Sequence, residues 1–267
     1  IDFSTVGRIS VEGADNSTNG ILHFFSRCAN GTNSKTVLVL DANSRISLSN
    51  NDGNTSNTVF GQNAFTNDAG GNAILGDVGA DQNVAIGTDA MGTGTKLVTV
   101  NNVAIGYKAL EDVTTGDGNV TLGRTAGSSL TSGSSNVAIG SNDNVTEGAL
   151  EASLLVGKCV AIGTGAVGQG VVTADADGTI AIGYKSLFAL TSGAECVAMG
   201  FEVGKVGTTI DYSTLIGYQS GYSLTLGRYN TAVGRRTLFT DEGGESSTAI
   251  GYGALYTQDM GASRVSS

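Results

Sequence analysis

Proline and tryptophan are both absent from the 267 residues, histidine occurs once, at His23, and only 14% of the residues are charged. Proline has no backbone N–H to donate, so its absence is expected of a chain whose strand N–H groups all take part in sheets. An active site needs a base and a nucleophile held together. His23 lies in the apolar stretch Ile21 to Phe25, where a structural role is favoured. We therefore expect no enzyme and no cofactor.

Several other features are also missing. The cysteines, Cys28, Cys159 and Cys196, are odd in number and form no CxxC pair. They predict neither a disulfide framework nor a zinc site, and we interpret them as small apolar residues. No run of 18 apolar residues occurs, so we expect no membrane insertion. The net charge is −10 without a basic patch, which argues against nucleic acid as a partner.

Glycine is abundant, with 41 residues, and much of it belongs to a repeat of the form Asn-x-Ala-Ile-Gly. Repeats of fixed period are typical of solenoids and related arrays. Typical copies are NVAIG at Asn102 to Gly106 and NTAVG at Asn230 to Gly234, and we also read SLLVG and CVAIG between Ser153 and Gly163 as a compressed double copy. The repeat glycines are Gly61, Gly76, Gly87, Gly106, Gly123, Gly140, Gly157, Gly163, Gly183, Gly200, Gly217, Gly234 and Gly251.

Most of these glycines recur at a fixed period of about 17 residues, from Gly106 to Gly157 and again from Gly183 to Gly251. Each unit is too poor in apolar residues to form a core alone, so neighbouring units must stack. Residues alternate between the two faces of a strand. We expect Val84 and Ile86 to point inward as an interior ladder, and a stretch such as Tyr107 to Leu110 to form a second short strand. We expect the first Asn of each unit to hydrogen-bond along the stack.

These patterns predict an all-β fold, a parallel β-solenoid or β-roll with coils of about 17 residues. We divide the chain into a short β-rich lead-in segment (1–52), the solenoid of repeats (53–257) and a C-terminal tail (258–267).

The NxAIG repeat resembles the head repeat of YadA-type trimeric autotransporter adhesins. That resemblance implies a left-handed β-roll with three chains side by side. The variants NVAIGYKAL and STAIGYGAL, with the lead-in from Ile21 to Asp52, more closely resemble repeats in phage tail fibres. Such fibres are often followed by an intramolecular chaperone of the endosialidase type, which cleaves itself off after a serine. Ser267 is then a candidate cleavage end, the alternative being an arbitrary limit of the chain.

The resemblance implies a homotrimeric shaft segment of a tail fibre in a virion, supporting attachment to a host. Its partners would be two further copies, other tail proteins and a glycan or protein receptor on the host surface. One alternative is the head of a bacterial trimeric autotransporter adhesin at the cell surface. A second is a fibre-borne glycan depolymerase, which would need two opposed carboxylates.

Two local patterns have competing interpretations. The Asp-x-Asp-Gly at Asp175 to Gly178 is superficially similar to a calcium loop, but position 12 is Ser186 rather than Glu, so we expect no metal site. The tyrosines that follow repeat glycines could form an exposed aromatic ladder for sugar binding, although packing at a subunit contact or along the coil edge is favoured. They are Tyr107, Tyr184, Tyr218 and Tyr252.

Overall fold

The computed structural model describes the backbone of residues 8–12, 21–27 and 34–40, and the full structure of residues 57–66, 79–93, 98–141, 148–153, 155–168, 172 and 176–257. The first group forms a three-stranded antiparallel sheet in the order β1 (Arg8–Glu12), β2 (Ile21–Arg27) and β3 (Ser34–Leu40). Cys28, Gly76 and Ser267 lie outside the described residues, as does Asp175.

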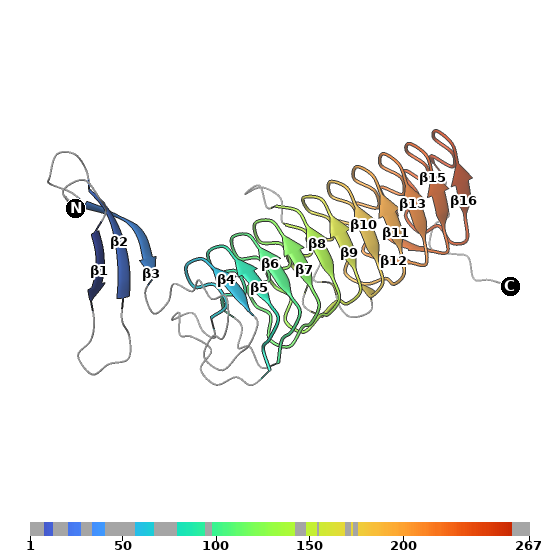
Figure 1. Cartoon of the computed structure of the whole chain (residues 1–267). Coiled ribbons are helices and arrows are strands. Elements are labelled where there is room, and N and C mark those ends of the chain that lie inside the picture. The colour runs from blue at the N-terminus through green and yellow to red at the C-terminus, as the bar shows by residue number, and fades with distance from the viewer. Residues whose placement is uncertain are drawn as a thin grey trace.

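The repeats build one 11-stranded parallel sheet of three-residue strands. Figure 1 shows them stacked as successive coils, each contributing one arrow to the same wall. The strands are β4 (Thr58–Phe60), β5 (Val84–Ile86), β6 (Val103–Ile105), β7 (Val120–Leu122), β8 (Val137–Ile139), β9 (Val160–Ile162), β10 (Ile180–Ile182), β11 (Val197–Met199), β13 (Thr214–Ile216), β15 (Thr231–Val233) and β16 (Thr248–Ile250). The predicted all-β parallel solenoid is confirmed, with coils of about 17 residues.

Pairing is in exact register, since each strand places its three residues opposite the equivalent three of the next coil, as Val103, Ala104 and Ile105 do opposite Val120, Thr121 and Leu122. Coils of irregular length keep this register. β8 pairs directly with β9 although the chain between them is longer than in a regular coil, and β4 pairs directly with β5. The compressed double copy is therefore one long coil. Gly157 lies in the turn before Cys159, where its N–H donates to Asp177 Oδ1 (2.7 Å).

The orientation of the strand residues is the reverse of the expected one. The middle residue of each strand is buried, as at Ala85, Ala104 and Ala181, while the β-branched residues on either side are half-buried or exposed. Val84 and Ile86 thus lie on the outer face. The prediction of an interior Val/Ile ladder was wrong because other residues of the coil already fill the narrow interior.

Those residues come from the segment after the repeat glycine, which is a turn and not the second strand we predicted. Lys108 and Leu110 have φ angles of 56° and 52°, and a backbone that visits the left-handed region at alternate residues cannot form a strand. This conformation turns Leu110 inward, where it is fully buried.

Side-chain size is complementary between the strand and this turn. Ala181 is followed six residues later by Leu187, and Ala232 by Leu238, all buried. Where the strand carries the larger Leu215, the turn carries Gly221, on which a Cβ would lie 3.0 Å from Leu215 Cδ1. In these three coils the strand and turn residues together keep a similar volume, as close packing requires. Ala198 and Gly204 are both small. Leu187, Ile210 and Leu215 approach the free space at Gly204 instead.

Most repeat glycines lie directly above one another in successive coils, at the end of each strand, and form a continuous column of glycine. A Cβ on Gly123 would lie 2.6 Å from the carbonyl oxygen of Gly140 in the next coil, and Gly123 has φ +127°. The same collision with the next coil's glycine recurs at Gly87, Gly106, Gly140 and Gly163. Backbone approach and backbone conformation both demand glycine here.

The first residue of the described units from Asn57 to Asn136 forms a buried ladder of amides, as expected. Asn119 donates its backbone N–H to Asn102 Oδ1 (2.8 Å) and its Nδ2 to the Gly133 carbonyl (2.9 Å). Cys196 occupies the equivalent place, and its thiol donates to the carbonyl of Ile210 (2.7 Å). Cys159 and Cys196 are buried and unbridged. They therefore serve as small hydrogen-bonded residues of the ladder.

Candidate functional site

The outer face of the 11-stranded sheet forms a long strip along the described coils. Its outward positions are the first and third residues of each strand, and every one of them is apolar or threonine. Val120, Leu122 and Met199 have 37%, 45% and 38% of their surface exposed. Eleven strands spaced about 4.8 Å apart make this strip about 48 Å long. An uncharged apolar strip of this length is unusual on a monomeric protein.

An aromatic column runs beside this face in the C-terminal coils, at the residue that follows the repeat glycine. Tyr184, Phe201 and Tyr218 stack with ring centroids 5.3 and 5.4 Å apart. Arg235 continues the column, with its guanidinium carbon 5.3 Å from the Tyr218 ring and 5.4 Å from the Tyr252 ring. The aromatic ladder suggested by the tyrosines is thus present from Tyr184 to Tyr252, with Phe201 and Arg235 as further members. Tyr107 lies outside this stack, since its ring contacts Lys108 and Arg124 instead.

Stacked rings cover one another's faces and leave mainly their edges to solvent. Because pyranose rings bind aromatic residues through the ring face, an uninterrupted ladder is a poor platform for sugar. A matching column on the next corner, Tyr222, Phe239 and Tyr256, has centroid distances of 5.3 and 5.0 Å. Both columns stiffen the coil edges.

One polar network ties neighbouring coils between these columns. Glu202 accepts hydrogen bonds from Lys205 (2.6 Å) and, across the coil boundary, from Gln219 (2.9 Å). Burial alone would raise the pKa of Glu202, but these hydrogen bonds hold it below its usual value. The pKa of Lys205 is raised by the same pairing, against the opposing effect of burial. The network is structural, since each of the three groups is paired within it.

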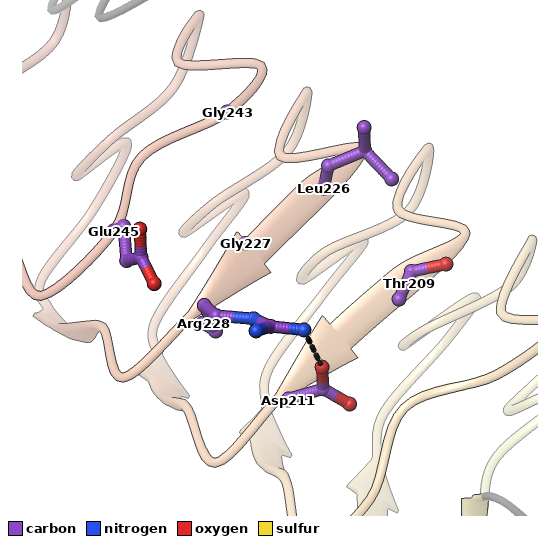
Figure 2. Close-up of a pocket in the computed structure, with 7 residues that line it drawn as sticks. All are labelled: Thr209, Asp211, Leu226, Gly227, Arg228, Gly243 and Glu245. Carbon is purple, nitrogen blue, oxygen red and sulfur yellow. Dashed lines mark hydrogen bonds and ion pairs between the residues drawn. The ribbon is translucent and has the colours of Figure 1, made fainter. Parts of the chain in front are cut away.

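A second wall appears in the C-terminal coils, where β12 (Thr209–Asp211) and β14 (Leu226–Arg228) form a short parallel sheet. A groove of about 310 Å³ crosses its outer face, lined by Thr209, Asp211, Leu226, Gly227, Arg228, Gly243 and Glu245. Figure 2 shows Arg228 reaching toward Asp211 on one side, with Glu245 on the other. At the corner that joins this wall to the apolar face, Tyr212 and Tyr229 stack at 5.3 Å.

The groove contains two carboxylates, but they do not face each other across an empty cleft. Asp211 accepts from Arg228 (3.1 Å) through Oδ2 and from the backbone N–H of Ala194 (3.2 Å) through Oδ1. Register places Arg228 between Asp211 and Glu245, since Asp211 pairs with Arg228 and Arg228 bridges to Glu245. Glycoside hydrolysis needs two carboxyl groups on opposite sides of the scissile bond. This arrangement is suited to holding a ligand and lacks that geometry.

The other residues singled out in the sequence do not form a metal or catalytic site among the described residues. No group of three or more His, Cys, Asp or Glu side chains that could hold a metal ion occurs within the described ranges. Of the Asp-x-Asp-Gly pattern, Asp177 is described, and its carboxylate is used to accept the Gly157 N–H. His23 lies in β2, and nothing is described of its side chain. The described part of the chain contains no helix with the length and hydrophobicity of a membrane-spanning segment.

Comparisons of the chain with protein-family models, with curated proteins and with solved structures gave no match.

Proposed function

We propose that the chain is a structural and adhesive segment of a homotrimeric fibre of the phage tail fibre type, which supports attachment to a host cell. The observation that carries the proposal is the outer face of the 11-stranded sheet, where each outward position from Thr58 to Ile250 is uncharged. The resemblance of the repeats to trimeric fibre repeats agrees with it.

Further copies of this chain are the best-matched partners for that outer face. The strip repeats at the spacing of the coils, so a partner with the same repeat matches it along its whole length. The chain carries a net charge of −10, yet none of that charge lies at these positions. Two or more identical faces can therefore meet without bringing like charges together. Burying half-exposed Val, Ile, Leu and Met stabilises such contacts by about 25 cal/mol per Å².

The test is the mass in solution, measured by light scattering after size exclusion, of the wild-type chain and two variants. We expect a wild-type mass near three times 26.8 kDa. Ile139→Lys places a charge on the outer face and should give monomers that keep their β-sheet circular dichroism. Ser135→Lys is the matched control, because Lys158 already occupies the equivalent corner of the next coil, with φ angles of 60° and 56° at the two positions. It should remain trimeric.

A monomeric wild type, or an Ile139→Lys variant as trimeric as the wild type, would overturn the proposed assembly. Placement in a virion requires a separate measurement. Immunogold labelling with antibodies against this chain should decorate phage tails. Labelling of bacterial surfaces instead would favour the adhesin head, which the same trimeric architecture serves.

A further inference from the structure

We propose that one sugar ring of a neutral glycan binds at the edge of the groove beside β12 and β14, stacked on the open face of Tyr229, which directly follows the groove residue Arg228, and hydrogen-bonded by Arg228 and Glu245. The inference deepens the proposed function, and rests on it in naming a class of host receptor. It assigns attachment to the C-terminal coils and not to the apolar face.

The aromatic surface comes from an interrupted column. Tyr212 covers one face of Tyr229, with an interplanar angle of 8°. The next place in this column, one coil further on, is Ser246, which is small and exposed. The backbone N–H of Ser246 donates to the Arg228 carbonyl (2.9 Å), just as that of Tyr229 donates to the Asp211 carbonyl (3.1 Å), so the two residues are equivalent. The second face of Tyr229 consequently has no ring against it within the described coils, and Tyr229 is 54% exposed.

This interruption distinguishes Tyr229 from Tyr218. In the first aromatic column, Tyr218 lies between Phe201 and Arg235, so both of its faces are covered. A ring beside Ser246 would lie one coil away from the Tyr229 ring, a distance of about 4.8 Å. That is the spacing at which a flat ring stacks on an aromatic ring. A pyranose ring placed there becomes the third member of the Tyr212 and Tyr229 stack.

The polar groups beside that place are arranged as donors and acceptors. Arg228 is anchored by Asp211, which is itself fixed by the Ala194 N–H, and its side chain is still 54% exposed. Its remaining N–H groups are thus oriented in advance, which lowers the entropy lost on binding. Glu245 lies one coil away, and the described residues include no hydrogen-bond or ion-pair partner for its carboxylate.

Charge selects among the possible ligands. An anionic sugar would meet Asp211 and Glu245, and a cationic group would meet Arg228. A hydroxyl group both donates and accepts, so adjacent hydroxyls of a neutral sugar can satisfy the guanidinium and the carboxylate together. The groove volume of about 310 Å³ lies at the lower end of the range for ligand sites, roughly 300–1,000 Å³. The groove is therefore large enough for the one sugar ring proposed here.

The test uses the full chain on an array carrying neutral hexose and N-acetylhexosamine oligosaccharides beside sialylated and uronic-acid ones. The neutral oligosaccharide that binds most strongly on the array is then titrated into the protein by calorimetry. We expect neutral glycans to bind, and Tyr229→Ala to weaken binding about tenfold or more. Ser246→Tyr should abolish binding by filling the vacant place. Tyrosine is tolerated in this conformation, since Tyr212 and Tyr229 have φ angles of 49° and 58° where Ser246 has 56°.

Tyr107→Ala is the matched control, because Tyr107 is 41% exposed but belongs to another corner and a distant coil. It should bind as the wild type does. Binding restricted to acidic glycans, binding unaffected by Ser246→Tyr, or no binding to any neutral glycan would overturn the site. Light scattering on the same samples separates this outcome from the proposed assembly, since a monomer that binds neutral glycans refutes the trimer alone.

Discussion

The backbone N–H of Asn119 donates a hydrogen bond to Oδ1 of Asn102, 2.8 Å away in the preceding coil. Asn119 in turn accepts from the backbone N–H of Asn136 at 3.0 Å. Both side chains are fully buried. The amides therefore satisfy backbone groups that would otherwise be unpaired at the strand entrance.

Asn119→Ala should lower the free energy of unfolding by about 2–4 kcal/mol, because it leaves the Asn136 N–H and the Gly133 carbonyl without their side-chain partner. Asn119→Ser should cost less, since Ser213 occupies this place elsewhere and accepts from the Asn230 N–H (3.1 Å). Urea unfolding followed by circular dichroism gives both values. Equal destabilisation by Ala and Ser would contradict the role assigned to the side-chain oxygen.

Gly123→Ala tests the glycine column. The added Cβ would meet the Gly140 carbonyl oxygen at 2.6 Å, and the backbone has φ +127°, so neither space nor conformation accepts it. We expect a loss of roughly 3 kcal/mol or more.

The control for this prediction is Gly118→Ala. Gly118 also has a positive φ, +65°, but the nearest atom to a Cβ there is Ser135 Oγ at 3.8 Å. It should cost only about 1–2 kcal/mol, the ordinary penalty of a left-handed alanine. If thermal melting shows the two variants to be equally stable, the close approach of the coils is not what requires glycine at Gly123.

Leu215 and Gly221 form a pair of complementary size that a double-mutant cycle can measure. Leu215→Ala leaves a cavity and should cost about 2–5 kcal/mol. Gly221→Leu alone should also destabilise, since a Cβ there already lies 3.0 Å from Leu215 Cδ1. The double variant recreates the arrangement of Ala232 and Leu238, and Leu238 tolerates φ 48° where Gly221 has 59°. We expect it to be more stable than either single variant, and simple additivity would refute the complementarity.

The sequence was sufficient to predict the solenoid, its period and the amide ladder, because a constant repeat length and the columns of Asn and Gly follow from stacking identical backbones. It did not reveal which face of the strand points inward. Alternation in Val103, Ala104 and Ile105 is the same for either orientation, and residue size alone favours the wrong one, with Val103 and Ile105 inside. The deciding residue is Leu110, whose left-handed backbone (φ 52°) is rare for leucine and carries no sequence signal.

The groove was missed for a related reason. Asp211, Arg228 and Glu245 follow one another at the interval of one coil, so they meet only once the coils are stacked. Tyr212 and Tyr229 share that spacing but do not follow a repeat glycine, so the Gly-Tyr pattern of the repeat does not include them. The signal for both groups is their recurrence at the coil period.

The ladder cysteines predict a specific loss of stability at high pH. Burial raises the pKa of the Cys159 thiol, and that of Cys196, to about 11, although nearby backbone hydrogen bonds lower it slightly. In the unfolded chain a thiol ionises near its ordinary pKa of 9.0. Between pH 9 and 11 the unfolded state therefore loses protons that the folded state keeps. Each thiol should reduce the free energy of unfolding by about 1.4 kcal/mol per pH unit within this window, and not below it.

The measurement compares two proteins that both carry Cys28→Ser, one of them also carrying Cys159→Ser and Cys196→Ser. Serine is compatible with the ladder, as Ser213 and Ser247 show, but it does not titrate in this range. Tyrosine and lysine titrations are common to both proteins and cancel in the difference between their unfolding free energies. That difference should be constant below about pH 8 and fall between pH 9 and 11. Parallel curves across the whole range would mean that the thiols ionise as readily in the folded solenoid as in the unfolded chain. The hydrogen bond from the Cys196 thiol to the Ile210 carbonyl would then contribute nothing measurable to stability.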